Sequence, residues 1–98
     1  MIQQGDVLII KTKEVKGKKL DHVTLALGEA TGHHHSITKG DALLFEDENG
    51  TLFLDVKSSE AELTHQEHKP VTIKKGKYRV GIVREYDHFA EEAREVID

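Results

Sequence analysis

Apolar residues in this chain occur in short runs that alternate in character and are separated by turn-forming residues. Residues 23–27 and 78–82 alternate between larger apolar side chains and others, with a period of two. This is the period of a β-strand with one buried face, and glycine-containing turns between such runs are typical of an all-β domain. The spacing predicts about seven to eight short strands in one domain, residues 1–98. We expect a small, mainly β fold that forms a β-barrel or a sandwich.

Turn signals place the ends of several of these strands. Asn49-Gly50 is a strong hairpin signal. Lys74-Lys75-Gly76 also predicts a tight turn, and Pro70 marks the edge of a strand.

One segment departs from the alternating pattern. Residues 87–97 carry apolar side chains at 89, 93, 96 and 97, which is helical spacing. Asp87 is a suitable N-cap, and two glutamates follow early, where the helix dipole favours anions. We therefore expect one C-terminal helix over 87–97, packed on the sheet.

Composition and charge exclude several classes of protein. The formal net charge is −4, which argues against strong binding of duplex nucleic acid but is compatible with a small-molecule or short-nucleotide substrate. Cysteine is absent, so disulfides, thiolate zinc sites and cysteine nucleophiles are excluded. The N-terminal stretch MIQQGDVLII is too weakly apolar for a signal peptide or an anchor. We expect a cytoplasmic protein that does not enter a membrane.

Three consecutive histidines form the most unusual motif of the chain. In an extended segment His33 and His35 point to one side, and His34 points to the other. Ile37 shares the side of His35, so we expect that side to face inward. His34 and Ser36 are expected to face solvent or a partner subunit.

A second histidine segment, Thr-His-Gln-Glu-His, follows thirty residues later. His65 and His68 are three apart, a spacing that brings two side chains together on a turn, and Glu67 lies between them. We predict one metal site in which His33, His35 and His68 are ligands and in which His65 or Glu67 completes the set.

Imidazole and carboxylate ligands suit a divalent transition metal: zinc, iron, manganese, nickel or copper. Three protein ligands leave a coordination position for water or substrate, and Glu67, if it is not a ligand, is a candidate base for that water. The first hypothesis is therefore a histidine-rich metal-binding protein, with metal-dependent hydrolysis as its candidate activity.

Two other functions stay open. A metal-free nuclease or phosphodiesterase would use one histidine as base and another as acid, with Tyr86 among the supporting groups. A non-enzymatic binding module would place its histidines at the interface of a homo-oligomer. His22 and His88 have neighbours that indicate ordinary surface positions.

The segments GDVLII, LALGEATGHHHSI, LTHQEHKPVTIKKGKYRV and REYD resemble a group of short, uncharacterised bacterial and phage-associated proteins with G-H-x-H and H-x-E-H-x-P segments. The resemblance runs from Gly5 to Asp87 and implies no established activity. The residues that it picks out are His33, His35, His65, Glu67, His68 and Tyr86. Gly32-His33-His34-His35 also resembles the H-x-H motif of cupins, which are metal-binding β-barrels. That second likeness is partial, since the later cupin glutamate has no counterpart.

Overall fold

The described part of the chain forms eight β-strands. The structure, a computed structural model, describes residues 1–27 and 33–82, so the predicted helix over 87–97 and Tyr86 lie outside the described residues. The strands are Ile2–Gln4 (β1), Val7–Lys11 (β2), Lys18–Lys19 (β3), Thr24–Leu27 (β4), His34–Lys39 (β5), Ala42–Glu46 (β6), Leu52–Thr64 (β7) and Val71–Ile82 (β8).

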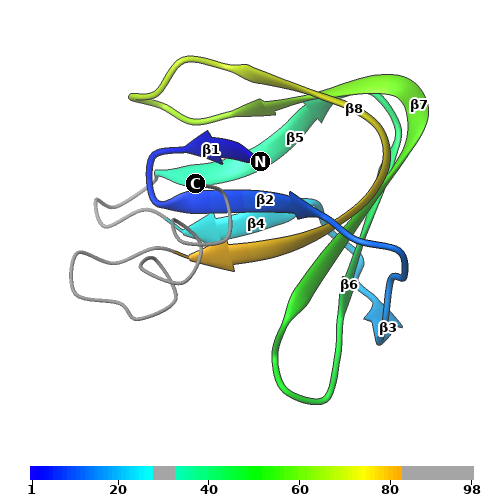
Figure 1. Cartoon of the computed structure of the whole chain (residues 1–98). Coiled ribbons are helices and arrows are strands. Elements are labelled where there is room, and N and C mark those ends of the chain that lie inside the picture. The colour runs from blue at the N-terminus through cyan, green and yellow to red at the C-terminus, as the bar shows by residue number, and fades with distance from the viewer. Residues whose placement is uncertain (28–32, 83–98) are drawn as a thin grey trace.

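All eight strands belong to one antiparallel sheet built around the long hairpin of β7 and β8. The main path of the sheet runs β1-β2-β8-β7-β5-β4. β6 also pairs with β7, and the short β3 pairs with β6. β7 therefore has β8 along one side, while its other side is shared between β6 near its start and β5 near its end. Figure 1 shows the two long strands curving, so that the sheet wraps around its own concave face.

The sheet is open, so the prediction of a closed barrel or a sandwich is wrong. A barrel closes only when its first and last strands pair. In the described part of the chain, β1 pairs with β2 and β4 pairs with β5, and these two end strands do not pair with each other. The prediction failed because local alternation reports which strands exist, whereas closure depends on pairing between strands far apart in sequence.

The curvature comes from an irregularity within the long hairpin. The register of β7 against β8 shifts between Val56 and Glu60, and Gly76 pairs with Val56 at that point. Irregularities of this kind bend a strand and increase its twist. The predicted turn at Lys74-Lys75-Gly76 is therefore wrong: the glycine lies inside β8, where the chain bends and continues. The Asn49-Gly50 hairpin is confirmed, since Gly50 has a φ of 80° in the turn between β6 and β7.

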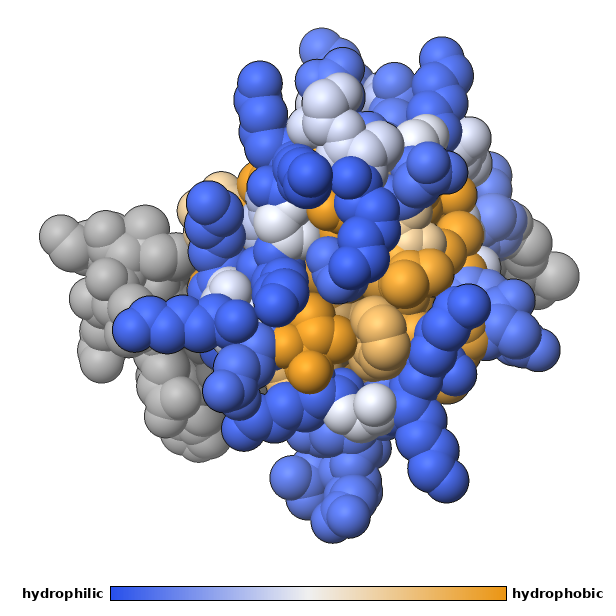
Figure 2. Space-filling view, turned by 90° about the vertical axis from the view of Figure 1, so that its right-hand side faces the viewer, coloured by the Kyte–Doolittle hydropathy of each residue, from blue (hydrophilic) through white to orange (hydrophobic). Residues whose placement is uncertain are grey.

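The hydrophobic core fills the concave face. Leu44, Leu54, Leu63 and Ile73 are fully buried in it. Half-buried residues of β1, β4 and β6 pack around them, as the period of two requires. Figure 2 shows that apolar side chains also reach the surface on one side of the molecule, where hydrophilic ones surround them. No helix in the described ranges has the length and hydropathy needed to cross a membrane.

Truncation of a core residue on β7 tests the role of the long hairpin. Leu54→Ala removes a side chain that has no solvent exposure, so we expect a loss of about 2–5 kcal/mol in the free energy of unfolding. Urea denaturation measures this loss. The same truncation at half-buried Leu20 is the control, with an expected loss below about 2 kcal/mol. Equal losses in the two variants would show that the core is not centred on β7.

Candidate functional site

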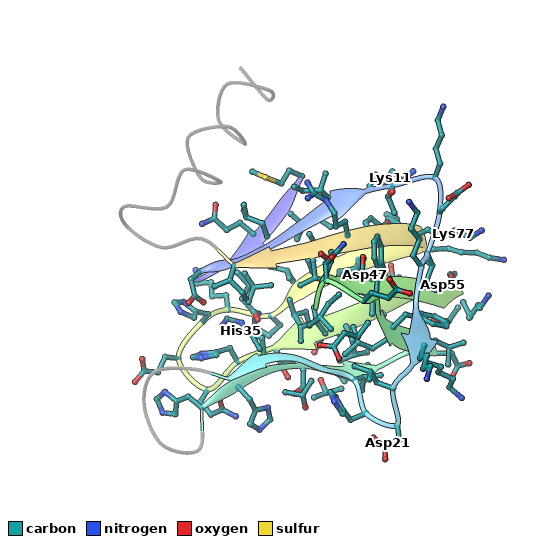
Figure 3. All side chains as sticks on the ribbon, turned by 90° about the horizontal axis from the view of Figure 1, so that it is seen from below. Lys11, Asp21, His35, Asp47, Asp55 and Lys77 are labelled. Atoms are coloured by element: carbon teal, nitrogen blue, oxygen red, sulfur yellow. The ribbon has the colours of Figure 1, made fainter. Side chains whose placement is uncertain are left out.

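Three segments of the chain meet at one end of the sheet: the β1–β2 hairpin, the start of β5, and the loop that follows β7. The start of β5 pairs with the end of β7, with Ser36 opposite Thr64. From the β1–β2 hairpin, the side-chain amide of Gln4 donates to the main-chain oxygens of Leu63 and Lys69, at 2.9 Å each. It thus fastens that hairpin to both ends of the loop over residues 65–70. Figure 3 shows His35 at this end of the sheet, with Lys11 and Lys77 at the other end.

The convergence brings together the four histidines proposed as ligands. The ring centre of His65 lies 4.3 Å from that of His35, 4.7 Å from that of His68 and 5.5 Å from that of His33. The rings of His35 and His68 are nearly parallel, with their centres 6.0 Å apart. Two segments thirty residues apart in sequence thus form one group, called here the histidine cluster: His33, His35, His65 and His68.

Gln4 determines the proton position on the buried His35. The ring of His35 is 1% exposed, and its Nδ1 lies 2.9 Å from Oε1 of Gln4. Since the amide nitrogen of Gln4 is used by two carbonyl oxygens, Oε1 is the group left to face the ring, and an amide oxygen only accepts. Nδ1 must therefore carry the proton, which leaves a free lone pair on Nε2 of neutral His35.

That lone pair faces a carboxylate. Nε2 of His35 lies 3.4 Å from Oδ1 of Asp6. Two acceptors face each other there, an arrangement that a cation between them would stabilise. Asp6 was missed in the sequence, where Gly5-Asp6 indicated only the start of a strand. The sequence does show a carboxylate in a two-residue hairpin loop, but His35, which this carboxylate faces, lies 29 positions further along the chain.

Gly5 brings the hairpin close to two of the rings. Its φ is +58°, as in a two-residue hairpin turn that begins with glycine. A methyl group at this position would lie 2.6 Å from Nε2 of His68 and 3.3 Å from Cε1 of His35. The backbone conformation therefore favours glycine, and a larger residue here would also displace the exposed ring of His68.

His65 has the opposite proton arrangement to His35. The backbone N–H of Glu67 donates to Nδ1 of His65 at 3.0 Å, so Nδ1 is an acceptor and Nε2 carries the proton.

Burial lowers the pKa of His65, and the charges of His68 and His33 lower it further. Burial also lowers the pKa of His35, with a second contribution from His65, while Asp6 opposes the shift.

The remaining predicted residues lie at the rim. Nδ1 of half-buried His33 is 3.8 Å from Oε1 of Glu67, whose side chain is 69% exposed. His68 is exposed as well.

His34 and Ser36, predicted to face solvent or a partner subunit, are both shielded within the chain itself. Ser36 is buried and His34 half-buried, and Nδ1 of His34 lies 2.7 Å from Oγ of Ser36. Gln66 accepts from the backbone N–H of His34, so its amide nitrogen faces Nε2 of His34 as a donor. The proton of His34 is then on Nδ1 and is donated to Ser36, whose hydroxyl lies 3.0 Å from Oγ1 of Thr24. Because Nδ1 is protonated, His34 cannot act as a base toward Ser36, and the network serves to hold β4, β5 and the loop together.

The rings are close, but their orientation is not that of a ready-made coordination shell. Within residues 1–27 and 33–82, no group of three or more histidine and carboxylate side chains is arranged so that it could hold a metal ion. Coordination of an ion would therefore require side-chain rotation.

The lowered pKa values predict a stability that depends on pH in chelator-treated protein. His35 and His65 have pKa values below the ordinary 6.5 when folded. The unfolded chain therefore takes up more protons as the pH falls below 6.5, and the free energy of unfolding must decrease. Urea denaturation at pH 7.5 and 5.5 measures this decrease. We expect a smaller decrease for His65→Gln than for the unaltered chain, because this variant lacks one of the two groups whose pKa is lowered. Identical pH dependence in the two proteins would contradict this expectation.

Comparison with known proteins gives one match. No curated protein and no solved structure matches the chain. The comparisons do not support the likeness to cupins or the predicted G-H-x-H motif, but they confirm that the relatives are uncharacterised. The match is to a family described as "Domain of unknown function (DUF8820)", over residues 3–83. Because it spans more than half of the sequence, the chain belongs to this family of unknown function.

Proposed function

We propose that the histidine cluster binds one divalent transition metal ion and that metal binding is the function of this domain. The proposed ligands are Nε2 of His35, the imidazole of His68 and the carboxylate of Asp6. One observation carries the proposal: the free lone pair of a buried imidazole faces a carboxylate oxygen at 3.4 Å. This is longer than the ~2.7–3.2 Å of an N–H···O hydrogen bond.

The spacings are those of ligands around an ion. Donor atoms that lie about 2.0–2.1 Å from a tetrahedral ion are roughly 3.4 Å apart, and the centres of two ligand rings are roughly 5 Å apart or more. The separation between His35 and Asp6 is 3.4 Å, and the ring centres of His35 and His68 are 6.0 Å apart. The side chains of Asp6 and His68 are exposed and can rotate toward a common ion, while buried His35 stays in place.

The surroundings of His35 also support the proposal. A histidine that binds a metal usually donates its other ring N–H to a fixed acceptor, which orients the ring and sets the tautomer. Gln4 provides this acceptor and is itself held by two backbone carbonyl oxygens. Nothing in hydrophobic packing requires a buried glutamine and a buried histidine to be paired in this way.

If the metal site catalyses hydrolysis, the two nearby carboxylates would have different roles, one as a ligand and the other as a base. Asp6 faces His35 as a ligand. Glu67 lies at the rim beside His33, where its exposed carboxylate is the candidate base for a metal-bound water. With three protein ligands, the ion keeps a position for that water.

Metal titration tests the proposal directly. We expect untagged protein to bind one equivalent of Co²⁺ or Zn²⁺ by isothermal titration calorimetry, and His35→Ala to lose this binding because it removes the only preorganised ligand. His22→Ala should bind as the unaltered chain does. Absence of metal binding in the unaltered chain, or full binding by a folded His35→Ala variant, would refute the proposal.

The role assigned to Gln4 has its own test, with the neighbouring glutamine as a matched control. Loss of an orienting partner typically lowers metal affinity by about 10–100-fold, so we expect a decrease of this size in Gln4→Ala. Gln3 lies next to it in β1 but is exposed, and its side-chain amide donates to the main-chain oxygen of Gly5. Gln3→Ala should therefore keep the unaltered affinity. Equal metal affinities in the two variants would show that Gln4 does not contribute to metal binding.

A further inference from the structure

The hydrogen bond that His65 accepts indicates that this residue is not a metal ligand. The backbone of Glu67 occupies Nδ1 of His65, so the proton of the ring is on Nε2. A protonated nitrogen has no lone pair for a metal. To become a ligand, His65 would have to break the hydrogen bond that the loop provides.

The position of the His65 ring supports the same conclusion. The centres of His65 and His35 are 4.3 Å apart, with their planes tilted by 34°. This is shorter than the roughly 5 Å between two ligand rings on a tetrahedral ion. The ring of His65 therefore lies against the ring of His35 and is too close to it for both to be ligands of one tetrahedral ion in these positions.

The Nε2–H of His65 has no acceptor among the residues that the structure describes. Among the described residues it donates to no protein group, and every fully buried side-chain nitrogen or oxygen there has a partner. The ring centre of half-buried His65 lies 4.3 Å from that of His35 and 4.7 Å from that of His68, the two proposed imidazole ligands. A donor this close to the ligands is suited to an oxygen atom bound to the same ion.

The charges at the site determine which oxygen ligand it would take. A divalent ion beside the single carboxylate of Asp6 retains positive charge, because the other proposed ligands are neutral imidazoles. Glu67, the second carboxylate nearby, faces His33 at 3.8 Å. An anionic oxygen ligand on the ion would balance the remaining charge and accept the His65 hydrogen bond.

We infer that His65 is a hydrogen-bond donor to a small oxyanion bound at the metal, and that the metal-loaded domain therefore takes a phosphate or carboxylate group as its ligand. The inference rests on the proposed metal site. It assigns to His65 the recognition of the anion, and to His35, His68 and Asp6 the binding of the ion.

The experiment uses Co²⁺-loaded full-length protein with inorganic phosphate as the probe. We expect phosphate to change the visible spectrum of the bound cobalt at a saturable concentration. His65→Phe should keep one equivalent of Co²⁺ but bind phosphate about tenfold or more weakly, since a charge-assisted hydrogen bond is lost. His65→Gln, which keeps a side-chain N–H donor, should recover part of the affinity, and His22→Phe should behave as the unaltered chain.

The outcomes are distinguishable. If the unaltered chain binds no cobalt, the proposed metal site fails and this inference fails with it. If cobalt binds but phosphate has no effect, or if His65→Phe binds phosphate as tightly as the unaltered chain, only this inference is overturned. Loss of cobalt in a His65→Phe variant that unfolds at the same urea concentration would show that His65 is a ligand.

Discussion

The side-chain amide of Gln4 is the interaction on which the candidate site depends. Its nitrogen joins the first hairpin to both ends of the loop over residues 65–70, and its oxygen fixes the tautomer of His35. The same group thus determines where three segments meet and which nitrogen of the buried ring has a lone pair. A carboxylate at this position could not donate to either carbonyl oxygen, and an apolar residue could make none of the three bonds. Position 4 therefore couples the tertiary structure to the chemistry of the cluster.

The open, curved sheet creates the conditions for this meeting. The register shift between Val56 and Glu60 bends the long β7–β8 hairpin. One part of β7 pairs with β6 and the other with β5, so the end of the hairpin lies beside the start of β5. The change of partner on that side of β7, from β6 to β5, thus occurs close to the irregularity and precedes the histidine segment that follows β7.

Local sequence pattern predicted the strands well, because alternation and Asn-Gly hairpins depend on neighbouring residues. It did not predict the openness of the sheet or the bend at Gly76, since both depend on which distant strands pair. For the site, residue type and spacing singled out the histidines. Asp6 and Gln4 were missed, because a turn carboxylate and an N-terminal glutamine acquire their roles only through contact with His35, about thirty positions away. The burial of Ser36 was also missed, since a hydrogen-bond network with His34 and Thr24 satisfies a hydroxyl that alternation alone would place outside.

The position of the cluster at the tips of hairpins has a consequence for how the family can diversify. The core residues lie along the concave face, whereas Asp6, His65 and His68 lie in turns that add little apolar burial. Replacement of these turn residues would change the selectivity of the site at small thermodynamic cost to the scaffold. His35 is the exception, because it is buried in the interior and is also a member of the histidine cluster. Thermodynamic stability therefore constrains the residues of the turns less than it constrains this imidazole and its glutamine.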